Sequence, residues 1–408
     1  MTRVLLLNSS KHRATELLAA DRTVDLAVVA KARHAEHYRH LPAVELVDDL
    51  ADVSAVTAAA LRLARRGPFD AVVAPVEAAV LPAAYLRSYL DVPGPTLDRA
   101  LPLVSKLHMK RRLAAAGLPT TEPVPVAGLD GLALAAATTG WPVVVKPMTG
   151  AGGVNTHVIG SAGELARLRA SGELDGLEHA AVPLVAERLV RVRRELHCDG
   201  VVEGGHVRFA AVSRYLSPLL WARERGVAGS CTLPESDPDV APVRELHAAA
   251  VGALGLDAGV THLECLVADE GMLVGEIACR PAGAAIVPAV ERRHGVDLWR
   301  AFVDLALGRR PALAAHDRGV VTGWLGLPGQ NGVVREVTPA GELAAIPGID
   351  RVSVLHRPGQ RVRQTVTTTF FAVQVEFTVP RLDAVDALVA EVCRRHRLAV
   401  DPEVAVRS

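Results

Sequence analysis

The stretch from Val260 to Pro281 constrains this chain most, because it predicts a β-hairpin in which two carboxylates face each other. Apolar residues recur at alternate positions over 261–268 and 272–279, as is typical of strands, and a loop containing glycine supplies the turn. This spacing sets Glu264 directly opposite Glu276. Like charges in that arrangement destabilise a sheet unless a cation lies between them.

The expected register follows from a three-residue loop, Asp269-Glu270-Gly271. It pairs Ala268 with Met272 and Leu266 with Val274. Two further residues share the face of Glu276, namely Ala278 and Arg280. The opposite face receives Leu273, Ile277 and Cys279. A divalent metal ion is the obvious cation for the acidic face, and the alternative is an ordinary hairpin whose outer face is solvated.

The composition bounds the class of protein. With 408 residues, two or three domains are expected. The 45 basic and 45 acidic residues balance, so there is no electrostatic argument for nucleic acid or an anionic membrane as a partner. The five cysteines are never closely spaced, which indicates neither a disulfide framework nor a zinc site and fits a reducing compartment. Without a signal peptide or a long apolar run, we expect a cytoplasmic protein.

The first 95 or so residues indicate an open α/β domain. Apolar runs at 3–7, 26–30 and 70–74 are typical of buried parallel strands separated by helices. No G-x-G-x-x-G follows the first run, which argues against a dinucleotide site and hence a dehydrogenase. Glu77 follows the third run, at the edge where open α/β sheets bind ligands. The histidines at 34, 37 and 40 are interpreted as surface residues, since no cysteine or carboxylate framework supports them.

A phosphate-binding arrangement is indicated by residues 139–160. Lys146 ends an apolar strand and is followed by a loop rich in glycine, whose backbone N–H groups can approach phosphate oxygens. A hairpin with a flexible glycine turn is the alternative. Upstream, Lys106 and Lys110 share one face of a predicted helix.

Residues 184–215 predict antiparallel strands joined by a turn at Gly204-Gly205. This turn would set Glu195 opposite Arg214 as a structural ion pair.

The ordered series resembles the ATP-grasp superfamily over roughly residues 100–300. Its motifs are S-K-x-x-x-K with a following A-G-L-P, V-V-V-K-P before a glycine-rich loop, H-C-D-G-V-V and G-E-I-A-C-R-P. The fold implied is α/β: an N-terminal open parallel α/β (pre-ATP-grasp) domain at 1–100, an ATP-grasp domain of two α+β subdomains clasping ATP at 101–310, with a lid at about 120–190, and a small strand-rich α+β domain at 311–408.

The resemblance implies roles for single residues. Lys106 and Lys146 are similar to the lysines that contact ATP phosphates, and 149–154 is similar to the mobile loop above them. The implied nucleotide contacts in this loop are Thr149, Gly150, Gly152 and Gly153. Those in the adenine-contacting hinge between the two subdomains are Glu187, Leu189 and Val190, and Glu195 is implied to hold the ribose. Glu264 and Glu276 match carboxylates that bind two Mg²⁺ ions, which Mn²⁺ can replace.

Ala278 departs from the pattern, because many members have an asparagine there as a third protein ligand. Water or another oxygen must then take that place. Arg280 matches an arginine near the transferred phosphate, so the implied catalytic residues are Arg280, Lys146 and Glu276.

Within the superfamily, the chain is most similar to carboxylate-amine ligases of the L-amino acid ligase group. The activity implied is amide formation through an acyl phosphate, with small-molecule carboxylate and amine substrates, and a homodimer is compatible with it. Two alternatives stay open: a carboxylase of the biotin-carboxylase or purine-carboxylase type that activates bicarbonate, and a nucleotide-binding protein without catalysis. The identity of the substrates depends on side chains in 213–231 and 281–288, which carry no general signature.

Overall fold

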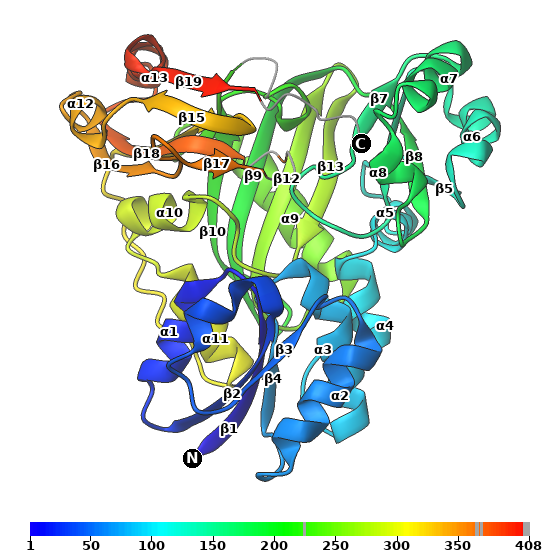
Figure 1. Ribbon diagram of the computed structural model, residues 1–408, viewed down its shortest axis with the longest axis vertical. Helices are drawn as coiled ribbons and strands as arrows, with labels where there is room; N and C mark the ends of the chain where they lie inside the picture. Colours follow the sequence, from blue (N-terminus) through cyan, green and yellow to red (C-terminus); the bar gives the residue numbers. More distant parts are fainter. Residues whose placement is uncertain (223–225, 364–366, 368–369, 403–408) are drawn as a thin grey trace.

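The structure, a computed structural model, describes residues 1–222, 226–363, 367 and 370–402. Its strands form four sheets, and the largest, with eight strands, runs through the middle of the molecule. Figure 1 shows the N-terminal sheet at one end and the two other sheets on either side of the opposite end. Within the described residues, no helix combines the length and the apolar character needed to span a lipid bilayer.

The N-terminal sheet is parallel, in the order β3-β2-β1-β4. Its elements are β1 (Thr2–Asn8), α1 (His12–Ala20), β2 (Val24–Lys31), β3 (Val44–Val47), α2 (Val53–Ala64), β4 (Ala71–Val73) and α3 (Val80–Leu90). Leu5 and Leu7 pack beneath α2 and α3, whereas Val4 and Leu6 belong to a cluster on the opposite face. Both faces of the sheet are therefore buried, which confirms the predicted doubly covered α/β arrangement.

Helix α11 (Leu298–Ala306) completes that domain from far along the chain. Its residue Val303 is buried in the same cluster as Val4 and Leu6. Figure 1 shows α11 beside α1, below the central sheet. The N-terminal sheet thus packs against the segment that follows the hairpin of Glu264 and Glu276.

The central sheet has the order β13-β12-β9-β10-β11-β14-β18-β16. Its strands are β9 (Val192–Glu203), β10 (His206–Tyr215), β11 (Ala228–Thr232), β12 (Gly259–Ala268), β13 (Gly271–Ala278), β14 (Val321–Pro328), β16 (Ile349–Val354) and β18 (Phe371–Val379). Leu196 and Cys198 pack with Leu263 and Cys265 in a core that includes residues of α5 (Lys106–Ala115) and α9 (Val240–Leu254). Polar residues alternate with them and lie on the opposite face, where the site forms.

The segment predicted as the lid, at about 120–190, forms a small sheet in the order β5-β8-β6-β7. Its elements are β5 (Val124–Val126), α6 (Leu132–Thr139), β6 (Val143–Pro147), β7 (His157–Ile159), α7 (Ala162–Ala170), α8 (Asp175–Glu178) and β8 (Leu184–Arg188). The lid has its own apolar core, which includes Val145, Leu165 and Ala186. The segment therefore packs as a unit of its own, and its role as a lid stays a prediction.

The C-terminal part consists of β14, β15 (Gly332–Val337), α12 (Ala340–Ala344), β16, β17 (Arg361–Val362), β18, α13 (Ala384–Arg395) and β19 (Leu398–Asp401). Strand β19 follows α13, so the last described element of the chain is a strand. Because β11 pairs with β14, the central sheet runs across the predicted boundary at residue 310. The division at that residue therefore stays a prediction.

Candidate active site

The hairpin of β12 and β13 brings the two predicted carboxylates together. Glu264 pairs directly with Glu276, as the sequence predicts. The turn itself is tighter than predicted, because Ala268 pairs with Gly271 rather than with Met272. A bulge beside Glu264, where Gly275 is the extra residue, compensates for the shorter turn and restores the predicted register.

The bulge also corrects the predicted faces of β13. Leu266 pairs with Leu273, not with Val274 as predicted. Val274 joins Ile277 in the core beneath α5 and α9, whereas Leu273 packs with Val190 in a separate cluster. Leu273 was expected on the face of Ile277, and the extra residue in the strand is the reason that it is not.

Lys106 links the glycine loop to the acidic hairpin. Its Nζ donates a hydrogen bond of 2.7 Å to the carbonyl oxygen of Gly150 and lies 3.5 Å from Oε1 of Glu276. Lys106 begins α5, and its backbone N–H donates to the carbonyl of Met148, just before the loop. The structure therefore brings together three features that the sequence placed far apart: a lysine, the loop and a carboxylate.

Two further lysines, Lys110 and Lys146, surround Glu187, which is 4% exposed. Lys110 Nζ lies 2.6 Å from its Oε2, and Lys146 Nζ lies 3.1 Å from its Oε1. Thr121 donates to Oε2 as well. Burial alone would raise the pKa of Glu187, but the charges of Lys110 and Lys146 outweigh it and lower the pKa to about 2. Two cations on one anion leave a net positive charge at the end of the lid strands.

Arg280 meets the N-terminal domain through Glu77. Its Nε donates to Oε2 of Glu77 at 2.7 Å, while Oε1 of Glu77 is buried and has no hydrogen-bond partner among the residues that the structure describes. Glu77 follows β4, at the carboxyl edge where the sequence suggested a ligand site.

Lys11, which follows β1 at the same edge, lies close enough to influence both groups. Burial and the charge of Arg280 lower the pKa of Lys11 to about 8, and Glu77 opposes them. Within the described residues, no ion pair involves the Lys11 ammonium, so this edge carries two cations and one carboxylate.

Comparison with known proteins decides the family. No protein-family model matches the chain. The chain is 30% identical over 405 residues to the L-arginine-specific L-amino acid ligase of Bacillus subtilis, and the match covers 98% of each protein. The chain belongs to the L-amino acid ligase family. A second relative, the uncharacterized protein y4rH of Sinorhizobium fredii, is 24% identical over 283 residues, which are 66% of this chain and 55% of that protein.

Solved structures confirm the ATP-grasp fold of this L-amino acid ligase family member. The L-amino acid ligase from Bacillus licheniformis superposes with a TM-score of 0.76 at 17% identity, over 98% of this chain and 99% of that one. A carboxyaminoimidazole ribonucleotide synthase from Aspergillus clavatus complexed with ATP gives a TM-score of 0.72 at 16% identity, over 97% and 99% of the two chains. The family member is therefore an ATP-dependent ligase that forms C–N bonds.

Glu195 does not lie opposite Arg214, with which the sequence predicted an ion pair. A bulge between Val207 and Phe209 shifts the register of β9 and β10, so that Arg214 pairs with Leu196. The predicted Glu195–Arg214 pair is therefore wrong, and Arg214 instead lies 3.6 Å from Asp386.

The Glu195 carboxylate accepts a hydrogen bond of 2.7 Å from the backbone N–H of Leu219. Burial, reinforced by the charge of Glu264, raises the pKa of Glu195 to about 8. Because Glu195 lies close enough to Glu264 to be affected by its charge, it belongs to the acidic face of the sheet. Its assignment to the ribose stays a prediction.

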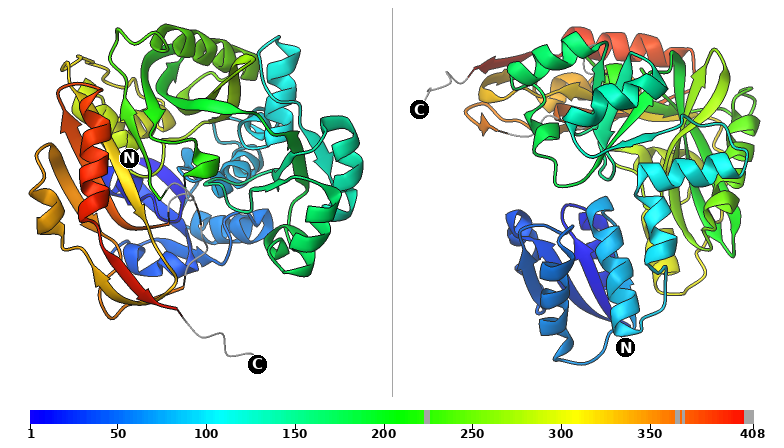
Figure 2. Two further views of the ribbon diagram at one scale, coloured as in Figure 1. Left: turned by 90° about the horizontal axis from the view of Figure 1, so that it is seen from above. Right: turned by 90° about the vertical axis from the view of Figure 1, so that its right-hand side faces the viewer.

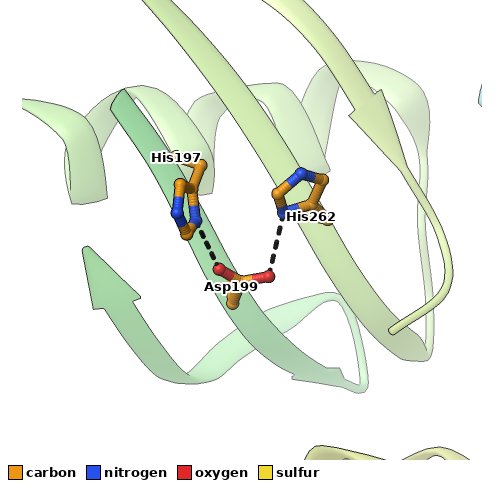
Figure 3. A group of neighbouring side chains, drawn as sticks. All are labelled: His197, Asp199 and His262. Carbon is orange, nitrogen blue, oxygen red and sulfur yellow. Dashed lines mark hydrogen bonds and ion pairs between the residues drawn. The ribbon is translucent and has the colours of Figure 1, made fainter. Parts of the chain in front are cut away.

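A buried polar cluster of His197, Asp199 and His262 lies beside Glu264, and the sequence predicted no role for it. Figure 3 shows His197 and His262 pointing toward Asp199, whose two oxygens lie 2.6 Å and 2.9 Å from their Nδ1 atoms. The alternating polar residues of E-L-H-C-D are the sequence signal, since they put three polar side chains on one face of a strand. Their partner on β12 follows only from the pairing of two strands distant in sequence.

The ligand atoms of this cluster lie within 4.8 Å of one another, a spacing that could hold a metal ion. Distances of 2.6 Å and 2.9 Å are those of hydrogen bonds, and both Asp199 oxygens are taken, so we interpret the cluster as hydrogen-bonded. The histidines at 34 and 37 lie elsewhere, in the helical turn 32–38, and His40 follows that turn. The His37 ring packs 4.0 Å from that of His12.

The acidic hairpin fits Mg²⁺ in this family member. Mg²⁺ prefers oxygen ligands, and two carboxylates facing each other supply them. Oε1 of Glu264 accepts from Tyr215, while no hydrogen bond or ion pair within the described residues involves Oε2. Ala278 is buried and pairs with His262, so its methyl group offers no third ligand. The proposed substrate-contacting range 213–231 includes residues 223–225, which lie outside the described residues.

Proposed function

We propose that this chain uses ATP to join the carboxylate of one amino acid to an amine, through an acyl phosphate. The observation that carries the proposal is the convergence of the Glu264 and Glu276 hairpin with Lys106 on one side and the Arg280–Glu77 pair on the other. Nucleotide chemistry and amino acid recognition then meet at one end of β13.

ATP would lie between the lid and the central sheet. Its phosphates would contact Lys106, Lys146 and the loop at 149–154, all of which present positive charge or backbone N–H groups. Both oxygens of Glu187 are taken up by lysines, so its contribution to the adenine would come from its backbone, together with Leu189 and Val190.

Glu264 and Glu276 would hold Mg²⁺, which neutralises charge on the phosphates when it is bound. The donor carboxylate oxygen attacks the γ-phosphorus of ATP, the bond to the β-phosphate oxygen breaks, and ADP leaves. The amine nitrogen then attacks the acyl carbon, phosphate departs with the bonding electrons, and the nitrogen loses a proton. Arg280 is placed to donate to the carboxylate and to the oxyanion that develops from it.

Recognition of an amino acid follows from the charges beside Arg280. The unpartnered Oε1 of Glu77 is an acceptor for an ammonium group, and Arg280 with Lys11 offers cations for carboxylates. A buried acceptor without a partner costs free energy, which an ammonium group would offset. Bicarbonate has no ammonium group for this oxygen, so the geometry favours an amino acid over the carboxylase alternative.

The relative from Bacillus subtilis is specific for L-arginine by its name, so L-arginine is the first donor to test. The experiment incubates the protein with ATP, Mg²⁺ and amino acids singly and in pairs, measures phosphate release and determines the mass of the product. A dipeptide mass supports the proposal. Phosphate release equal to the blank for every pair contradicts it, and release that depends on bicarbonate alone favours the carboxylase.

A further inference from the structure

Glu264 lies among buried polar side chains, and the strand register explains why. Strand β12 pairs with both β13 and β9, so Glu276, Glu264 and His197 form one row across three strands. The neighbouring row consists of Ala278, His262 and Asp199. Because side chains two residues apart on a strand share a face, the two rows lie side by side on the acidic face of the sheet.

A chain of hydrogen bonds crosses these rows and ends on one oxygen of Glu264. Asp199 is fully buried and accepts from His262 Nδ1 at 2.9 Å. His262 Nε2 lies 3.5 Å from Oε1 of Glu264 and 3.3 Å from the hydroxyl oxygen of Tyr215. Tyr215 donates to the same Oε1 at 3.1 Å. Figure 3 shows the part of this chain that lies between β9 and β12.

His197 holds the second oxygen of Asp199. Its Nδ1 donates to the second oxygen of Asp199 at 2.6 Å, and its ring packs 4.8 Å from that of Tyr215. Asp199 therefore has a donor on each oxygen and cannot rotate without breaking one of the two bonds. A carboxylate fixed in this way fixes the ring of His262 in turn.

The small side chain at position 278 leaves room for this arrangement. Ala278 pairs with His262 across the hairpin, and it is buried with only a methyl group. The imidazole, rather than a side chain from β13, therefore occupies the space beside Glu264. Within the described residues, Oε2 of Glu264 takes part in no hydrogen bond or ion pair and is left available for a ligand.

We propose that Asp199, His262 and Tyr215 are positioning residues that hold Oε1 of Glu264 and thereby present Oε2 to Mg²⁺. This inference rests on the proposed function, because Mg²⁺ belongs to that function. Groups that orient a metal ligand from behind typically change metal affinity by about 10- to 100-fold when they are removed. The effect of removing them should therefore fall on the metal and leave the affinity for the nucleotide itself unchanged.

The test measures Mn²⁺ binding to the protein with ADP, by electron paramagnetic resonance. We compare Tyr215→Phe, which removes one oxygen, and Asp199→Asn with the wild type. The control is Cys265→Ala, which is next to Glu264 on β12 but faces the core. We expect Tyr215→Phe and Asp199→Asn to raise the Mn²⁺ dissociation constant by roughly 10-fold or more, while the control stays within roughly twofold of the wild type. ADP affinity without metal should not change in any of them.

A second readout separates positioning from a general structural role. Turnover of Tyr215→Phe should recover at high Mg²⁺, because the ligand atoms are still present, whereas Glu264→Gln should not recover. Circular dichroism shows whether both variants fold. If one of them does not, His262→Gln takes its place beside the other. Wild-type Mn²⁺ affinity in the folded variants overturns the inference.

The proposed function fails by a different result. If the wild type binds no Mn²⁺ with ADP, or if Glu264→Gln binds it as the wild type does, Glu264 is not a metal ligand and the proposed chemistry falls. If Glu264→Gln abolishes binding while Tyr215→Phe and Asp199→Asn bind normally, only the positioning inference is wrong.

Discussion

Arg280, at the end of the acidic hairpin, donates through Nε to Oε2 of Glu77, a residue 203 positions earlier in the chain, at 2.7 Å. The pair joins the carboxyl edge of the N-terminal sheet to the end of β13. Figure 2 shows the N-terminal domain set apart from the lid and meeting the rest of the molecule along one side. The proposed amino acid site would therefore lie where the N-terminal sheet meets the end of β13.

Glu77→Gln should weaken the binding of amino acids and spare that of ATP. The substitution keeps the shape of the side chain and removes the charge that Oε1 offers an ammonium group. A hydrogen bond to a charged group contributes about 1.5–3 kcal/mol, so the KM for the amino acid should rise by about 10- to 100-fold. Steady-state kinetics with each substrate varied in turn provide the measurement. Glu45→Gln, a surface carboxylate paired with Arg62, is the control and should behave as the wild type.

Lys11 should give amino acid binding a pH dependence. Its pKa is lowered to about 8, so below that pH it is a cation and above it the charge is lost. The groups that face it are Arg280 and Glu77, which stay paired with each other. The KM for the amino acid should therefore rise as the pH passes upward through about 8. Lys11→Met should show the high KM at every pH and no inflection there, and an inflection that persists in this variant would exclude Lys11 as its source.

Lys110→Met should destabilise the protein. Glu187 would lose its partner at 2.6 Å while it remains buried. Removing one member of a buried ion pair typically costs about 3–5 kcal/mol, and because Lys146 and Thr121 remain we expect about 3 kcal/mol. Urea unfolding followed by circular dichroism measures the change. Arg111→Met, an exposed residue on the same helix, should unfold at the wild-type urea concentration.

Glu276→Gln should separate nucleotide binding from turnover. In the proposed site, ATP would keep its contacts with residues 149–154 and 187–190, whereas the metal would lose one carboxylate. We expect turnover to fall by at least about 100-fold, with little change in ATP affinity as measured by calorimetry. Glu270→Gln lies on the turn of the same hairpin, where Glu270 pairs with Arg188, and should keep full activity. Equal turnover in the two variants would remove Glu276 from the metal site.

The sequence was sufficient for those features that depend on local periodicity. The alternation of β12 and β13 sets Glu264 opposite Glu276, and the pairing is confirmed even though the turn is one residue shorter than predicted. The order of Lys106, Lys146 and the glycine loop indicated the ATP-grasp family, which the comparisons confirm.

Features that depend on pairing between distant segments were not accessible from the sequence. The bulge between Val207 and Phe209 moved Arg214 away from Glu195, and strand periodicity alone cannot locate such a bulge. Both oxygens of Glu187 are occupied by lysines from two other elements. The cluster of Asp199 and His262 required the register of β9 on β12, which joins segments more than 60 positions apart.

The central claim is that this chain activates an amino acid carboxylate as an acyl phosphate, and isotope transfer tests it most directly. A donor amino acid labelled with ¹⁸O in both carboxylate oxygens is incubated with ATP, Mg²⁺, an acceptor amino acid and the protein, and the mass of the released phosphate is determined. The account predicts one ¹⁸O atom in each phosphate, because the attacking carboxylate oxygen stays with phosphorus when the amine displaces it. Phosphate without ¹⁸O would show that water, and not the carboxylate, receives the phosphoryl group, and would contradict the account.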